Sequence, residues 1–217
     1  MSASLPPLRQ KILWGVLIAI LVGTAANIAF WWFRNQAKLG TPFVTFKRLG
    51  PPEGSLLAVY GQAPDFSLTE RSEKTLSKTD LLGTPWIADF IFTSCAGQCP
   101  LMSLEMQKLQ KQFPAETGLR LVSFTVDPER DSPQVLSSYA ERYGAEKERW
   151  FFLTGPLGET NRILKEFFLS PAEEPAMHSI RFILVDEKGQ TRGYYDSSDT
   201  GAMEQLIHDT NLLLKQK

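Results

Sequence analysis

Between residues 86 and 214 the sequence alternates between segments typical of β-strands and segments typical of α-helices. Runs of apolar and β-branched residues predict strands at Trp86–Phe92, Leu119–Val126, Phe151–Leu153, Arg181–Val185 and Gly193–Tyr195. Helical periodicity predicts helices at Pro100–Gln112, Pro133–Tyr143, Glu159–Phe167 and Met203–Leu214. Because strands and helices both need partners for their apolar faces, this alternation predicts an α/β domain with helices on both faces of a central sheet.

The ends of the predicted helices carry residues that favour helix starts and stops. Pro100 and Pro133 suit the first turn of a helix, and Ser132 is a natural N-cap before Pro133. Gly144 follows the second predicted helix, as a C-terminal glycine commonly does. Asp186–Gly189 predicts a tight turn, so the last two strands form a hairpin before the terminal helix. This order of elements is typical of a thioredoxin-like domain, with a central mixed sheet flanked by helices.

A long uncharged segment precedes this domain. Ile12–Phe33 comprises 22 residues without a charged side chain, enough to cross a hydrocarbon core of about 30 Å as a helix. A cleaved signal peptide is the alternative. However, the segment exceeds the usual apolar core of about 7–15 residues and ends in the aromatic run Phe30–Phe33. We therefore predict one uncleaved N-terminal transmembrane helix.

This segment divides the sequence into four parts. Residues 1–11 form a short cytoplasmic tail, 12–33 the transmembrane anchor, and 34–56 a linker with one strand candidate at 43–47. Residues 57–217 form the thioredoxin-like domain. The short tail and the large C-terminal domain fit an orientation with the N-terminus inside. Because no Arg- and Ser-rich amphipathic leader is present, a bacterial inner membrane with the domain on the extracytoplasmic side is favoured over a mitochondrial location.

Cys95 and Cys99 are the only cysteines, and they follow the predicted strand Trp86–Phe92 where a helix is expected to begin. In open α/β sheets, functional sites gather beyond the carboxyl ends of strands. Residues four apart share one helical face, so both sulfurs can point at one object. That object is either a metal ion or the other sulfur. Two cysteines are too few for a disulfide scaffold.

The surroundings of this pair favour a reactive role over two inert core cysteines or one structural disulfide. The unpaired amides and positive dipole end of a helix N-terminus stabilise a thiolate, the form that binds metals and attacks disulfides. Thiolate softness favours Cu(I) or Zn²⁺ over hard cations. The formal net charge of −1 makes nucleic acid an unfavoured partner. The sequence lacks the motifs of phosphate-binding loops, zinc proteases and serine hydrolases.

Four segments of the domain resemble the Sco/SenC family, membrane-anchored thioredoxin-like copper proteins that assist cytochrome c oxidase assembly. They are Ala63–Leu68, Phe92–Pro100, Phe124–Pro133 and His178–Asp186. The resemblance implies that Cys95 and Cys99 are the two thiolate ligands of a copper ion and that His178 is its imidazole ligand. In this chain the neutral segment 96–98 separates the cysteines, where the family often carries proline and acidic residues.

For most of the other potential metal ligands, the sequence favours an ordinary structural role. His208 lies among apolar residues of the terminal helix and is predicted to be structural or solvated. Met102 and Met106 recur at helical spacing, which favours core packing over copper ligation, whereas Met177 is a weak ligand candidate. The loop Asp127–Asp131 could place a carboxylate near the cysteines, but we expect it to shape the entry to the next helix.

The resemblance implies a copper metallochaperone. Reduced Cys95 and Cys99 would capture copper with His178. The ion would then pass by ligand exchange to the copper centre of cytochrome c oxidase subunit II or another copper acceptor. A different class stays open: a thiol–disulfide oxidoreductase that uses Cys95 and Cys99 as a redox-active pair to reduce acceptor cysteines, with His178 dispensable. A copper-responsive redox sensor without transfer activity is a third, weaker interpretation.

Overall fold

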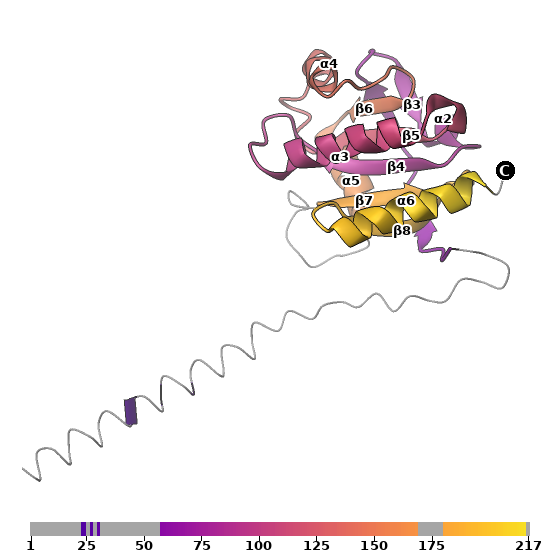
Figure 1. Cartoon of the computed structure of the whole chain (residues 1–217). Helices are drawn as coiled ribbons and strands as arrows, with labels where there is room; N and C mark the ends of the chain where they lie inside the picture. Colours follow the sequence, from indigo (N-terminus) through magenta and orange to yellow (C-terminus); the bar gives the residue numbers. More distant parts are fainter. Residues whose placement is uncertain (1–22, 25–26, 28–29, 31–56, 169–179, 216–217) are drawn as a thin grey trace, which may run out of the picture. The chain divides into compact units, whose positions relative to one another are not determined.

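The computed structural model describes residues 57–168 and 180–215, together with four helical residues of the N-terminal segment (Figure 1). These four are Gly23, Thr24, Asn27 and Phe30. The predicted tail, most of the predicted anchor, the linker with its strand candidate, Met177 and His178 lie outside the described residues. None of the described helices combines the length and the apolar character needed to cross a bilayer.

One mixed sheet, with eight strands within the described residues, forms the centre of the domain, in the order β1-β8-β7-β4-β5-β6-β2-β3. The strands are β1 (Gly61–Gln62), β2 (Ser67–Glu70), β3 (Thr75–Ser77), β4 (Trp86–Ile91), β5 (Arg120–Thr125), β6 (Trp150–Thr154), β7 (Arg181–Val185) and β8 (Gln190–Asp196). β4, β5 and β6 run parallel at the centre, and the other neighbouring strands pair antiparallel. The predicted α/β fold with a central mixed sheet is confirmed.

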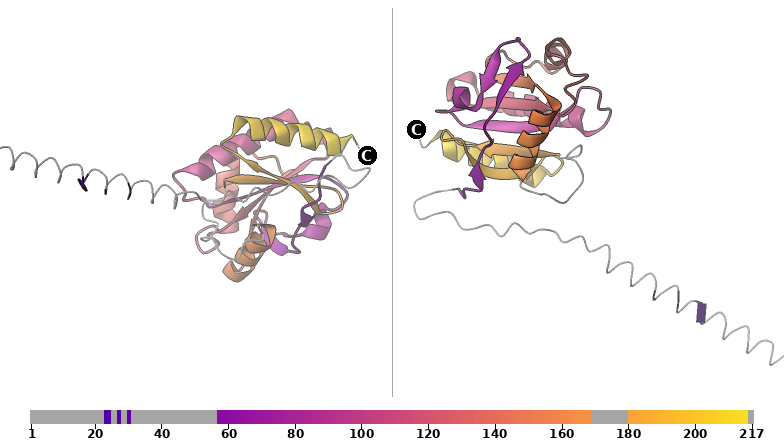
Figure 2. Two further views of the ribbon diagram at one scale, coloured as in Figure 1. Left: turned by 90° about the horizontal axis from the view of Figure 1, so that it is seen from below. Right: turned by 180° about the vertical axis from the view of Figure 1, so that it is seen from behind.

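Helices cover both faces of this sheet (Figures 1 and 2). They are α2 (Lys78–Leu81), α3 (Gln98–Gln112), α4 (Pro133–Arg142), α5 (Leu157–Phe168) and α6 (Thr200–Leu214), with a short 3₁₀ helix at Ala115–Thr117. α3, α4 and α6 contribute to the apolar core on one face, and α2 and α5 contribute to the core on the other. The fold therefore has the three layers that alternating strands and helices predict.

The central strand β4 takes part in both cores, and all six of its residues are buried. Ile87 and Ile91 belong to the core beneath α3 and α6. Trp86 and Phe90 belong to the opposite core. Successive side chains of a strand point to opposite faces, so a strand covered on both faces needs a continuous apolar run. Asp89 is the one charged residue in this run, and it points to the same face as Ile87 and Ile91.

Three predicted helix starts need correction. α3 begins at Gln98 and α5 at Leu157, each two residues before the predicted start at Pro100 or Glu159. α6 begins at Thr200, three residues before Met203. For α6 the reason is Asp199, whose carboxylate accepts hydrogen bonds from two amides of the first turn at 2.8 and 3.3 Å. The predictions also omit β1, β2 and β3. These strands have only two to four residues and show no sustained alternation of polar and apolar side chains.

The predicted start of α4 is confirmed, and the helix ends at Arg142, one residue before the predicted Tyr143. Pro133 is its first residue, and the Ser132 hydroxyl accepts a hydrogen bond from the Val135 amide at 3.3 Å. Gly144, two residues past the end of the helix, has a φ of 63°, in the left-handed region that favours glycine. These local signals hold α4 in place after β5, close to the cysteine loop.

Gly193 on β8 is required because the Tyr195 ring lies against it. A Cβ at this position would fall 2.3 Å from Tyr195 Oη, which donates a hydrogen bond to Asp209 on α6 at 2.7 Å. We expect Gly193→Ala to displace the tyrosine and to lower the free energy of unfolding by about 2–3 kcal/mol, measured by urea denaturation. Gly158→Ala is the matched control, since a Cβ there meets no atom within 4 Å. Equal losses in both variants would contradict this account.

Candidate metal centre

The cysteine pair lies where β4 is followed by α3. β4 ends at Ile91, the loop 92–97 follows, and α3 begins at Gln98. Cys95 lies in the loop and is half-buried, whereas Cys99 is the second residue of the helix and has only 6% of its surface exposed. The expectation that both cysteines share one helical face is therefore wrong, because Cys95 precedes the helix. The loop brings the two sulfurs together at the carboxyl end of β4.

Cys95 is placed to ionise easily. Burial by itself would raise the pKa of Cys95, but hydrogen bonds to its sulfur outweigh burial and lower the pKa below its ordinary value. The donors are the backbone amides of Cys99, Gly97 and Gln98 and the Cys99 thiol. The Gly97 amide lies 3.4 Å from the sulfur. These amides open α3, where N–H groups without helical partners stabilise a negative charge.

Cys99 has the opposite environment. Burial, with smaller contributions from the Cys95 sulfur and the Asp89 carboxylate, raises the pKa of the Cys99 thiol to about 12. Both thiols are free in this structure. The pair thus combines an accessible sulfur that ionises easily with a buried sulfur that keeps its proton. Such a pair can ligate a soft metal ion, or it can exchange disulfides with Cys95 as the attacking thiol and Cys99 as the second one.

Asp89 is a residue near the site that the sequence analysis missed. Its side chain is fully buried, and neither carboxylate oxygen accepts a hydrogen bond from a described residue. Burial raises the pKa of Asp89 to about 7, and the nearby Ser123 hydroxyl opposes this shift without reaching hydrogen-bonding geometry. The sequence does carry a signal: an acidic residue inside an apolar strand must find a partner or lose its charge.

Asp131 lies in the segment between β5 and α4, and its side chain reaches the cysteine loop. Its fully buried carboxylate accepts hydrogen bonds from the Thr93 amide (3.1 Å), the Thr93 hydroxyl (2.5 Å) and the Thr125 hydroxyl (2.5 Å). Ser132, the next residue, provides the N-cap of α4. The structure therefore corrects the expectation that Asp131 serves only the entry to that helix. The sequence analysis considered a carboxylate of this loop near the cysteines, but no local pattern identified Thr93, 38 residues away, as the partner of Asp131.

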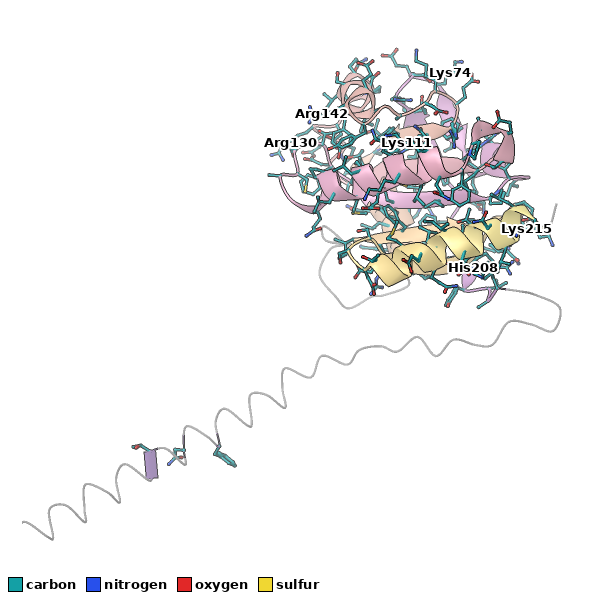
Figure 3. All side chains as sticks on the ribbon, viewed as in Figure 1. Lys74, Lys111, Arg130, Arg142, His208 and Lys215 are labelled. Atoms are coloured by element: carbon teal, nitrogen blue, oxygen red, sulfur yellow. The ribbon has the colours of Figure 1, made fainter. Side chains whose placement is uncertain are left out.

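The other candidate residues have the structural roles predicted for them. Met102 and Met106 are buried in the core beneath α3, and His208 is exposed on α6 (Figure 3). Across residues 57–168 and 180–215, no group of three or more His, Cys, Asp and Glu side chains forms a metal-binding arrangement. His178, the third predicted ligand, lies outside the described residues. The two sulfurs are thus the part of the predicted centre that the structure shows.

Comparison with known proteins supports the resemblance. A family model described as SCO1/SenC matches residues 59–215. The SCO1 protein homolog of Bacillus subtilis is 33% identical over 154 residues, which cover 66% of this chain and 78% of that protein.

Solved structures show the same fold. BsSco, a member of the Sco family of cytochrome c oxidase assembly proteins in which a disulfide switch was identified, is 30% identical with a TM-score of 0.64. The match covers 75% of this chain and 99% of BsSco. Yeast Sco1 with copper bound is 26% identical with a TM-score of 0.55, over 74% of this chain and 94% of the yeast chain. The thioredoxin-like fold is thereby confirmed. Because the family model spans nearly the whole described domain, this chain belongs to the SCO1/SenC family.

Proposed function

We propose that this protein is a membrane-anchored copper metallochaperone. Cys95 and Cys99 hold the ion together with His178, and the protein delivers it to the copper centre of cytochrome c oxidase subunit II. The observation that carries the proposal is the pair of free cysteines at the end of β4, in a family whose yeast member was solved with copper bound. Two thiolates and an imidazole are soft and intermediate ligands that suit copper.

The two cysteine side chains suit a soft metal ion as the cargo of the protein. The Cys95 sulfur already accepts several hydrogen bonds as a thiolate would, and it is the accessible member of the pair. The Cys99 thiol, with its pKa near 12, must release its proton when the metal binds. Copper affinity is therefore expected to weaken as the pH falls. Oxidation of the pair to a disulfide removes both thiolates and abolishes binding.

Anchoring supports the transfer step. The uncharged segment Ile12–Phe33 is long enough to hold the domain at a bacterial inner membrane, on the extracytoplasmic side. An acceptor in the same membrane then meets the domain at a raised effective concentration. Copper passes by ligand exchange, in which acceptor ligands replace the two sulfurs and the imidazole in turn.

An anaerobic copper titration tests the proposal. The full chain, reduced and held in mild detergent, is titrated with Cu(I) in competition with a chelator. We expect one tight equivalent, weakened by at least about a hundredfold in Cys99→Ser and in His178→Ala, because losing a ligand costs more than losing a ligand's own hydrogen-bond partner. His208→Ala is the matched control and should keep parental affinity, since this histidine is exposed on α6. Binding that is weak in the parent, or equal in both histidine variants, would overturn the three-ligand site.

A second function, thiol–disulfide exchange, is favoured by the opposite pKa shifts of the two cysteines. The Cys95 thiolate attacks an acceptor disulfide and releases one acceptor thiol. Cys99 then attacks Cys95, which forms the Cys95–Cys99 disulfide and releases the second acceptor thiol, so the acceptor gains two electrons that the pair loses. Reduction of an acceptor disulfide at the parental rate by copper-free His178→Ala would favour this function.

A further inference from the structure

The loop that carries Cys95 is held to β5 through the Asp131 carboxylate. Both hydrogen-bond donors of Thr93 point to it: the amide to Oδ2 at 3.1 Å and the hydroxyl to Oδ1 at 2.5 Å. The third donor is the hydroxyl of Thr125, the last residue of β5, which reaches Oδ2 at 2.5 Å. One side chain thereby links the end of β5 to the segment that follows β4.

This carboxylate depends on those three donors. Asp131 is fully buried, and among the described residues no Lys, Arg or His forms an ion pair with it. The neighbouring Arg130 is exposed and pairs with Asp127 instead, at 3.1 Å (Figure 3). A buried carboxylate without a cation is stable only where charge-assisted hydrogen bonds replace its water. Since two of the three bonds come from Thr93, the position of Thr93 is tightly constrained.

Thr93 lies inside the turn that ends at Cys95. The Cys95 amide donates to the Phe92 carbonyl at 3.2 Å, which closes the turn 92–95 around Thr93. On the other side of Cys95 the segment 96–98 is exposed. A Cβ on Gly97 would meet no atom within 4 Å. The turn before Cys95 therefore helps to place its sulfur, together with the amides at the start of α3 that donate to it.

We propose that Asp131 is a positioning residue for the cysteine pair: through Thr93, its carboxylate holds the turn that places Cys95 next to Cys99. The inference rests on the proposed function in that it concerns the same two ligands. Hydrogen-bond partners that orient metal ligands typically change metal affinity by about 10- to 100-fold. Because the same geometry brings the two sulfurs within bonding reach, it also favours the Cys95–Cys99 disulfide.

Three variants of the full chain separate positioning from general stability. Thr93→Val removes the hydroxyl donor of the turn and keeps its amide. Thr93→Ser retains the hydroxyl. Thr125→Val removes the third hydrogen-bond donor to the Asp131 carboxylate, but it changes β5 rather than the cysteine loop. Each is measured for Cu(I) affinity against a chelator, for the dithiol–disulfide equilibrium with glutathione, and for thermal stability.

We expect Thr93→Val to weaken copper binding about tenfold or more. It should also shift the glutathione equilibrium about tenfold toward the dithiol, which corresponds to about 30 mV. Thr93→Ser should restore both values, and Thr125→Val should leave both within about twofold of the parent even where its melting temperature falls. Parental values in Thr93→Val, or shifts in Thr93→Val that Thr93→Ser fails to restore, would overturn the role of Asp131. A parent that binds no copper would instead refute the metallochaperone function, while the glutathione equilibrium would still test Asp131.

Discussion

Replacing Asp89 by asparagine is expected to raise the free energy of unfolding at pH 8 by up to about 4 kcal/mol. The carboxylate is fully buried and has no hydrogen-bond partner among the described residues. Burial raises its pKa from 3.8 to about 7, a shift of about three units at about 1.4 kcal/mol each. Asparagine keeps the shape of the side chain and removes the charge. Urea unfolding followed by tryptophan fluorescence measures the change.

The same substitution is expected to flatten the dependence of stability on pH. Between pH 3.8 and about 7 the folded parent keeps a proton on Asp89 that the unfolded chain has released. The contribution of this group to stability is therefore fully present below pH 3.8, is lost as the pH rises to about 7, and stays constant above it. The gain from Asp89→Asn should accordingly be smaller at pH 5 than at pH 8.

Asp131→Asn is the matched control for this effect. Both aspartates are fully buried, but Asp131 accepts three hydrogen bonds whereas Asp89 accepts none from a described residue. At Asp131 the substitution weakens charge-assisted bonds and is expected to cost about 2 kcal/mol or more. Opposite signs at the two sites support the interpretation. A loss of stability at pH 8 in Asp89→Asn would contradict it.

Iodoacetamide is expected to modify Cys95 of the reduced, copper-free chain at least about a thousandfold faster than Cys99 at pH 7. Only thiolates react, and burial raises the pKa of Cys99 from 9.0 to about 12, which reduces its thiolate fraction by about three orders of magnitude. Hydrogen bonds from amides at the start of α3, which outweigh burial, act on Cys95 in the opposite direction. Mass spectrometry of the two peptides over time gives both rates.

The dependence of these rates on pH provides a second check. The rate at Cys95 should level off at a lower pH than the rate of an ordinary thiol, whereas the rate at Cys99 should keep rising toward pH 12. Because burial is the largest cause of the raised pKa of Cys99, this residue should stay slow in Cys95→Ser as well. Comparable rates at the two cysteines in the parent would show that α3 does not distinguish them.

These differences bear on both functions considered for the protein. A metallochaperone needs one accessible ligand that meets the incoming ion first, and an oxidoreductase needs one thiol that attacks and another that stays protonated until the second step. The accessible Cys95 and the buried Cys99 meet either requirement. Because only the proposed copper site includes His178, we expect His178→Ala to separate the two functions.

Local patterns in the chain were sufficient to predict the order of elements from β4 to α6. β7 coincides with the predicted segment Arg181–Val185, and α4 has the predicted cap at Ser132. The cysteines lie at the carboxyl end of β4, as the apolar run before them indicated. Such features depend on residues within a few positions of one another, because side-chain periodicity and helix capping are local interactions. The edge strands β1 and β3 and the neighbouring β2 were not predicted, since β1 and β2 pair with strands far away in the sequence.

The charge states and the support of the site depended on residues that only folding brings together. Cys95 and Cys99 are four residues apart, yet the pKa of one is lowered and that of the other raised, because desolvation and the number of amide donors differ between a loop and the helix beneath it. Asp131 contacts Thr93 across 38 residues of sequence. No local pattern encodes burial or a hydrogen bond of that range, so the cysteine pair could be identified from the chain as a candidate site but its environment could not.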